Sequence, residues 1–253
     1  MKKAARQLLF YLFLLLVWQL LFQRKLWPPY LFPSPTMVGE ALWQGFSDRT
    51  FLVGVTISMR RIALGYGFAV VLGVVLGFLI AASDFLEATV GGLVLSLQSL
   101  PSICWLPLAI LWFGLSERAI LFVVVMGSLL SVTINTEVGV RHVPKLYRMA
   151  GRNLGARGFG VFAHVLLPAS LPHLVVGLKQ GWAFAWRSLI SGEMIFVSLG
   201  LGHLLMVGRD LNDMSQVIAV MIVIMALGQL VDQLIFRGVE SRIRNRWGLA
   251  REV

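Results

Sequence analysis

Most of the chain alternates between long apolar stretches and shorter polar ones. Six apolar stretches are predicted to span a membrane, because a helix of about 20 residues crosses a hydrocarbon core about 30 Å thick. They cover residues 7–22, 62–82, 88–113, 119–137, 174–194 and 217–236. For the first stretch a signal peptide is the alternative. QRKLWPP follows it in place of a small-residue cleavage site, so we expect an uncleaved span.

Glycine and proline refine this pattern. Pro101 and Pro107 interrupt the third predicted span, and proline kinks a helix because it removes a backbone donor. A GxxxG pattern at 73–77 favours close approach of another membrane helix. The Ser-Pro pair at 34–35 predicts the start of a short surface helix. Residues 195–216 are glycine-rich and then polar, which indicates a re-entrant or surface segment.

A polar loop, residues 141–168, separates the fourth and fifth predicted spans. It contains five basic residues and no acidic residue: Arg141, Lys145, Arg148, Arg152 and Arg157. The first four recur at helical spacing, opposite an apolar stripe of Leu146, Met149, Ala150 and Leu154. Gly155 ends the pattern. We predict a short amphipathic helix, a glycine hinge and a proline stop, which either lie on anionic lipid or dock a cytoplasmic partner.

Composition places the chain in a membrane. Of its 253 residues, 58% are hydrophobic and 13% are charged, whereas soluble domains are about a quarter charged. We therefore expect one all-α transmembrane domain over residues 1–253, with no room for a soluble catalytic domain. The net charge of +10 is typical of the positive-inside bias and does not require nucleic acid.

The basic residues also predict the orientation. Six spans would put both termini and the loop on one side, which then collects thirteen basic residues against seven on the other. The larger group comprises Lys2, Lys3, Arg6, the five of the loop, and Arg237, Arg242, Arg244, Arg246 and Arg251. We expect the loop and both termini in the cytoplasm.

Several kinds of chemistry are excluded by the residues present. Cys104 is the only cysteine, so there is no internal disulfide or thiolate cluster, and the four histidines form no metal-binding spacing. No lysine follows a glycine, so the chain lacks a Walker A motif. We therefore predict no catalytic, cofactor or metal residues. The alternative is a membrane-embedded enzyme. The sequence does not favour it, because it shows neither paired carboxylates nor a nucleophile and base at a recognisable spacing.

The loop resembles a known motif. Its residues 149–155, followed by Leu167 and Pro168, are similar to the EAA loop of permease subunits of bacterial ABC importers. In that pattern Glu-Ala-Ala is followed by three residues, a glycine and, about a dozen residues later, Leu-Pro. Ala150, Gly155, Leu167 and Pro168 match, whereas Met149 replaces the glutamate and Gly151 the second alanine.

Other segments extend the resemblance over nearly the whole chain. LPSICWLPLAILWFGLSE at 100–117, GWAFAWRSLISGEM at 181–194, GLGHLL at 200–205 and an early FPSPTMV are similar to the nitrate/sulfonate/taurine branch. The resemblance implies a type I importer permease with six spans in the bacterial inner membrane. It also implies a homodimer, two ATP-binding subunits that use the ATP, and a periplasmic or lipoprotein substrate-binding protein.

The resemblance assigns the loop to ATPase coupling, through Met149, Ala150, Gly151, Arg152, Gly155, Leu167 and Pro168. The cargo would be a small anionic solute such as a sulfonate or nitrate. The alternative is an ion-coupled secondary transporter, which often shows an inverted repeat; none is evident here.

Polar and aromatic residues near the fifth span are candidates for the translocation path: Trp105, Trp182, Trp186, Arg187, Ser188 and Glu193. A guanidinium inside a span suits a carboxylate, sulfonate or nitrate. The alternative for Arg187 is an internal ion pair with Glu193 or Asp232. For the tryptophans, helix packing and interfacial anchoring are the alternatives.

Overall fold

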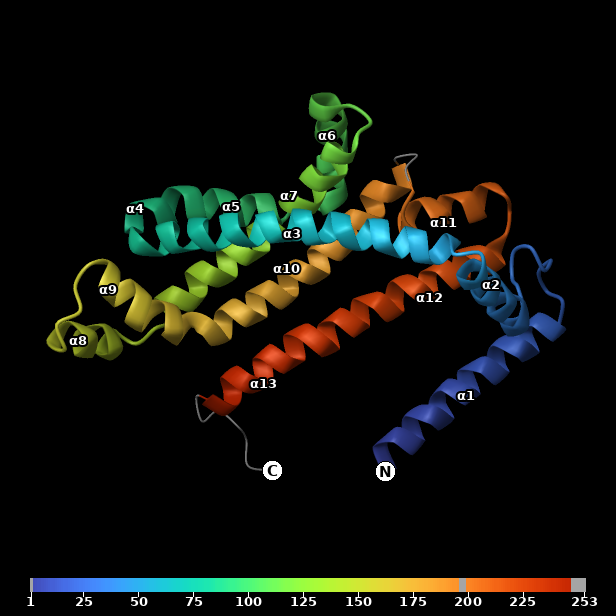
Figure 1. Ribbon diagram of the computed structural model, residues 1–253, viewed down its shortest axis with the longest axis horizontal. Coiled ribbons are helices and arrows are strands. Elements are labelled where there is room, and N and C mark those ends of the chain that lie inside the picture. Colours follow the sequence, from blue (N-terminus) through green and yellow to red (C-terminus); the bar gives the residue numbers. More distant parts are fainter. Residues whose placement is uncertain (1, 196–198, 247–253) are drawn as a thin grey trace. The chain divides into compact units, whose positions relative to one another are not determined.

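The computed structural model describes residues 2–195 and 199–246, and all regular structure in this part of the chain is helical (Figure 1). The helices are α1 (Lys2–Gln23), α2 (Pro35–Ser47), α3 (Thr50–Ala82), α4 (Asp84–Leu86), α5 (Gly92–Gln98), α6 (Leu106–Phe113), α7 (Glu117–Arg141), α8 (Lys145–Asn153), α9 (Phe159–Val161), α10 (Leu167–Ile195), α11 (Leu201–Asp210), α12 (Met214–Val231) and α13 (Arg237–Arg246). A 3₁₀ turn, η2 (Ser102–Trp105), and three π-helical turns, η1 (Glu87–Gly91), η3 (Phe162–Leu166) and η4 (Asp232–Phe236), join several of them.

Five of the described helices are long and apolar enough to cross a membrane: residues 5–23, 50–82, 117–141, 162–195 and 214–243. The third predicted span is different. Its two parts, Asp84–Gln98 and Ser102–Phe113, meet at an angle of 103°. The predicted interruption at Pro101 is therefore a sharp bend, because Pro101 adopts an extended backbone conformation. Counting the bent pair as one span brings the total to six, so the predicted all-α multispan fold is confirmed.

Several predicted boundaries differ from the structure, among them the start of the fifth span, at residue 162 and not 174, and the end of the sixth, at residue 243 and not 236. The second span begins at Thr50 and not at residue 62, so α3 includes Arg60 and Arg61. Arg61 is tolerated there because its Nε lies 3.3 Å from Oε1 of Glu117. The predicted proline stop is also wrong, since Pro168 lies in the first turn of α10. The π-helical turn η3 directly precedes it and adjusts the backbone where proline supplies no donor.

The chain folds as two compact units. The first comprises residues 1–58 and 193–227, and the second residues 59–192 and 228–253. In the first unit, Trp18 donates from Nε1 to the carbonyl of Pro33 at 2.9 Å. The hydroxyl of Ser34 caps α2 by accepting from the Met37 amide, which confirms the predicted surface helix. Beyond α2, the backbone N–H of Thr50 donates to Asp48 and lowers the pKa of that carboxyl.

In the second unit, α7 packs closely against parts of α3 and α10, which run beside it in Figure 1. A Cβ at Gly77 of α3 would lie 2.6 Å from the carbonyl oxygen of Thr133 on α7. Gly127 of α7 lies against Ser188 of α10, and Gly139 of α7 against His173. In lipid there is no hydrophobic driving force between helices, so their association depends on close van der Waals packing. Small residues at the contacts allow this packing.

Replacing Gly77 by alanine should therefore destabilise the protein by about 1–3 kcal/mol, since a methyl group would meet backbone that cannot swing aside. Gly67 on the same helix is the matched control, because a Cβ there meets no atom within 4 Å. Gly67→Ala should change the unfolding free energy by no more than about 1 kcal/mol, in the stabilising direction. Thermal unfolding in detergent checks both, and equal effects would contradict the packing described.

Candidate functional site

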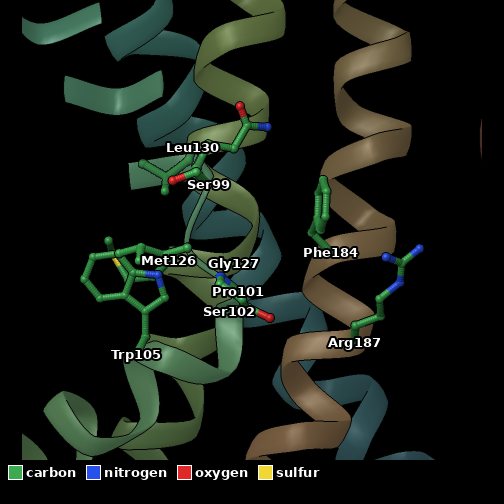
Figure 2. A pocket seen from close by; sticks show the side chains of 11 residues that line it. Ser99, Pro101, Ser102, Trp105, Met126, Gly127, Leu130, Phe184 and Arg187 are labelled. Carbon is green, nitrogen blue, oxygen red and sulfur yellow. The ribbon is translucent and has the colours of Figure 1, made fainter. Parts of the chain in front are cut away.

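A cavity of about 290 Å³ lies in the second unit, at the bend that follows α5. Its lining is mixed, with hydroxyl, amide, aromatic and cationic groups: Gln98, Ser99, Ser102, Trp105, Phe184 and Arg187 contribute the main side chains. Figure 2 shows the residues of the bend on one side and α10 on the other, with Phe184 directed toward the bend and the guanidinium of Arg187 directed away from it. The bend at Pro101 thus turns backbone that would otherwise continue a helix into one wall of a polar cavity.

Arg187 is the charged residue of this lining. Its side chain is exposed, and its guanidinium lies 5.6 Å from the ring centroid of Phe184, a cation–π distance. The proposed ion pair with Asp232 does not form, because Asp232 Oδ1 lies 3.1 Å from Lys179 Nζ. Within the described residues of its unit, Arg187 has no carboxylate partner within 4 Å. Its donors are therefore open to an anion.

The structure separates the other path candidates. Trp105 lines the cavity, whereas Trp182 and Trp186 are not among its lining residues. The rings of Trp182 and Trp186 are stacked, with their centroids 6.1 Å apart. Trp182 also meets the Tyr66 ring edge-on, at 5.5 Å. Ser188 is buried and donates to the carbonyl of Phe184 at 2.8 Å. Trp182 therefore joins α10 to α3, Trp186 and Ser188 make contacts within α10, and Trp105 and Arg187 are the two candidates that line the cavity.

Glu193 has a structural environment of its own, in the first unit. It is fully buried, and its two carboxylate oxygens accept from the hydroxyl of Ser58 at 2.9 and 2.7 Å. Oε2 also accepts from the backbone N–H of Gly202 at 3.1 Å, while the Ser58 hydroxyl accepts from that of Leu201. A carboxylate at the first amides of a helix is well placed, because those amides lack partners within the helix. Glu193 therefore anchors the start of α11 to α3.

Sequence reasoning missed this anchor. The available signal was a glutamate inside an apolar span, followed within a few residues by the Gly-Leu-Gly of 200–202. A Cβ at Gly200 would lie 2.6 Å from both carboxylate oxygens of Glu193. The glycine thus lets the backbone approach the buried charge. Phe196, Val197 and Ser198 of the predicted re-entrant segment lie outside the described residues.

The polar loop after α7 forms the predicted amphipathic helix, α8, and ends as expected. Gly155 adopts a left-handed conformation with φ of 89°, which favours glycine. The amide of Ala156 donates to the carbonyl of Gly151 at 2.9 Å, closing the end of the helix. Leu167 and Pro168 lie separately from this turn, in the first turn of α10.

The two departures from the EAA pattern fall on opposite faces of α8. Gly151 is buried, and a Cβ there would lie 2.6 Å from Cγ2 of Val165 in η3, so alanine does not fit without a shift. Met149 is two residues earlier, about 200° around the helix. Its side chain is 56% exposed, and Leu146 beside it is 69% exposed. We define the outer face of α8 as Lys145, Leu146, Met149 and Asn153.

Arg141, at the end of α7, is held by three carboxylates. Its Nη2 lies 2.7 Å from Glu87, its Nη1 3.4 Å from Asp84 and its Nε 3.5 Å from Glu137. Only the Asp84 contact has hydrogen-bond geometry, so the cluster acts mainly through charge. Nearby, Arg148 donates to the carbonyl of Val140 at 3.1 Å and ties α8 to α7. The sequence gives one signal of this cluster, because Glu137 and Arg141 are four residues apart and can pair on one face of a helix.

Comparison with known proteins decides the family. The model for "binding-protein-dependent transport system inner membrane component" matches residues 69–245. The chain belongs to this family. The permease is 29% identical to the nitrate import permease of Synechocystis sp., covering 88% of this chain and 83% of that one. It is 30% identical to the putative aliphatic sulfonates transport permease of Escherichia coli, covering 92% and 88%. Its fold resembles an inward-facing structure of the MetNI methionine ABC transporter, with a TM-score of 0.62 at 20% identity, covering 75% and 96%.

Membership confirms the resemblance inferred from the loop. The protein is a multi-pass inner-membrane permease of an ABC importer, in the nitrate/sulfonate/taurine branch. It is a transport component and not itself an enzyme, and ATP is used by a separate subunit. A binding-protein-dependent system also requires a substrate-binding protein. The secondary-transporter and enzyme alternatives are therefore set aside.

Arg141→Gln should destabilise the permease by roughly 1–2 kcal/mol, because three carboxylates would lose their shared cation in a partly exposed site. The double variant Glu137→Gln/Arg141→Gln should be more stable than Arg141→Gln alone, since one repelling charge is removed with the cation. Unfolding free energies arranged as a double-mutant cycle measure this coupling. Strictly additive effects would show that the cluster contributes nothing.

Proposed function

We propose that this permease conducts a small anionic solute, such as nitrate or a sulfonate, along a path that includes the cavity at Arg187. The observation that carries the proposal is Arg187, an exposed residue at the rim of a polar cavity, whose guanidinium has no carboxylate partner among the described residues of its unit. A guanidinium presents paired donors that match the oxygens of a planar or tetrahedral oxyanion. The nitrate and sulfonate relatives support the same class of cargo.

Because the Arg187 side chain is exposed, we expect it to bind a passing anion weakly and not to retain it. A fully buried, desolvated guanidinium would hold an anion tightly, whereas a partly hydrated one gains less from each contact. Trp105 and Phe184 supply apolar surface beside the charge, which accommodates the carbon part of a sulfonate. The Ser99, Ser102 and Gln98 side chains supply further polar groups along the same wall.

The importer assembly completes the proposal. Two copies of the permease would close the open cavity between them, and two ATP-binding subunits would bind the two α8 helices. The outer face of α8 is the docking surface in this account, with Met149 at its centre. Both termini and α8 would face the cytoplasm, in agreement with the distribution of basic residues. A binding protein would deliver solute at the opposite face.

Arg187→Gln should lower ATP-driven uptake of the anion by about tenfold, because one charge-assisted contact in the path is lost. Arg187→Lys should retain part of the activity, since it keeps the charge without the paired donors. Uptake is measured in proteoliposomes that contain the permease, its ATP-binding subunit and the substrate-binding protein, with labelled nitrate and taurine as probes.

The matched control is Arg60→Gln, which removes an exposed arginine of α3 outside the cavity. It should transport like the unmodified permease. Unchanged uptake in Arg187→Gln would remove Arg187 from the path. Uptake that persists without the ATP-binding subunit but stops with an uncoupler would instead indicate an ion-coupled transporter.

A further inference from the structure

A second cavity, of about 590 Å³, lies where α3 ends and the loop after α8 returns to the membrane. Two arginines, Arg152 and Arg157, contribute its charged groups. Most of the remaining lining is apolar, from Ala82, Val161, Phe162 and Leu166. A cavity with a cationic part and an apolar part fits a ligand that is itself divided in this way.

The apolar lining belongs to the ends of two membrane-spanning helices. Ala82 is the last residue of the span 50–82, and Phe162 is the first residue of the span 162–195. Arg152 and Arg157 come from the loop outside these spans. The cavity therefore lies beside the ends of two candidate membrane helices, where phospholipid is an abundant molecule with both parts.

The two arginines are also the ones available for a ligand. Arg141 is surrounded by three carboxylates and Arg148 donates to the Val140 carbonyl. Neither Arg152 nor Arg157 has a carboxylate within 4 Å among the described residues of the second unit. The loop from 141 to 168 contains no acidic residue that could supply one locally. Their positive charge is not neutralised within the described part of the unit.

We propose that this cavity binds one anionic phospholipid. The phosphate lies between the guanidinium groups of Arg152 and Arg157, and the start of an acyl chain packs against Phe162 and Leu166. Paired arginines at the cytoplasmic end of membrane helices are suited to anionic headgroups. The apolar lining favours lipid over a soluble anion. Arg152 lies on α8 between the buried side at Gly151 and the outer face, close to Lys145, so this site borders the docking surface. The proposal requires only that the chain is embedded in a membrane and is independent of the solute.

The test is native mass spectrometry of the purified permease released from micelles that contain equal amounts of phosphatidylcholine and phosphatidylglycerol. The unmodified protein should retain phosphatidylglycerol with about a 30-fold preference, which corresponds to about 2 kcal/mol for two basic contacts. Arg152→Gln/Arg157→Gln should lose that preference. The control Arg60→Gln/Arg118→Gln removes the same charge from exposed arginines outside the cavity and should retain it.

A second variant guards against misfolding of the first. Ala82→Phe keeps both arginines and fills the apolar part of the cavity, so it should also lose the retained lipid while eluting as a monodisperse protein. The proposal fails if the unmodified permease shows no preference, or if the preference survives Arg152→Gln/Arg157→Gln. Equal competition by soluble glycerol phosphate would identify a general anion site and overturn it. Displacement of the lipid on adding the ATP-binding subunit would assign the arginines to docking and also overturn it.

Discussion

Close packing between α7 and its neighbours in the second unit is the constraint on which the rest depends. Gly77 brings α3 against the backbone of α7, and Gly127 and Gly139 bring α10 against its other side. Helices that meet at backbone distance move together, because no flexible side chain separates them. The two ends of this packed group carry the two features to which we assign a function. The cavity with Arg187 lies between the bend at Pro101, α7 and α10, while α8 follows directly after α7. A displacement of α8 would therefore reach the cavity through packed helices.

The two departures from the EAA pattern have different surroundings on α8. Gly151 lets the helix lie against Val165, and Arg148 fastens it to the end of α7. The opposite face then presents Met149 and Leu146 to the surroundings. At the position of the glutamate in the EAA pattern this chain has Met149, whose flexible thioether side chain can adapt to an apolar groove. Arg141, held among Asp84, Glu87 and Glu137, fixes the point from which α8 departs. We infer that docking here depends more on apolar contact than on a charged anchor.

Local patterns predicted the helices well, whereas features that depend on distant partners were missed. Apolar stretches indicated the spans but not all of their ends, the Ser34 cap located α2, and Gly155 located the end of α8, since each depends on neighbours in sequence. The anchor at Glu193 depends on Ser58, 135 residues away, and the Arg141 cluster depends on Asp84, 57 residues away. The expectation of a stop at Pro168 failed because the π-helical turn η3 runs directly into α10 and accommodates the missing donor, and Pro172 likewise lies inside the same helix. The degree of the bend at Pro101 likewise depends on what packs around it.

Site-directed cross-linking at Met149 tests the central claim most directly. Cys104 is the only cysteine, so a Cys104→Ser permease with Met149→Cys carries a single reactive thiol on the outer face of α8. A maleimide photo-cross-linker on that thiol is activated in the assembled transporter, with Leu115→Cys as a solvent-accessible control at the far end of α7. The account predicts an adduct between position 149 and the ATP-binding subunit, altered in yield by a non-hydrolysable ATP analogue, and no such adduct from position 115. No adduct at 149 in an assembly that still transports would contradict it.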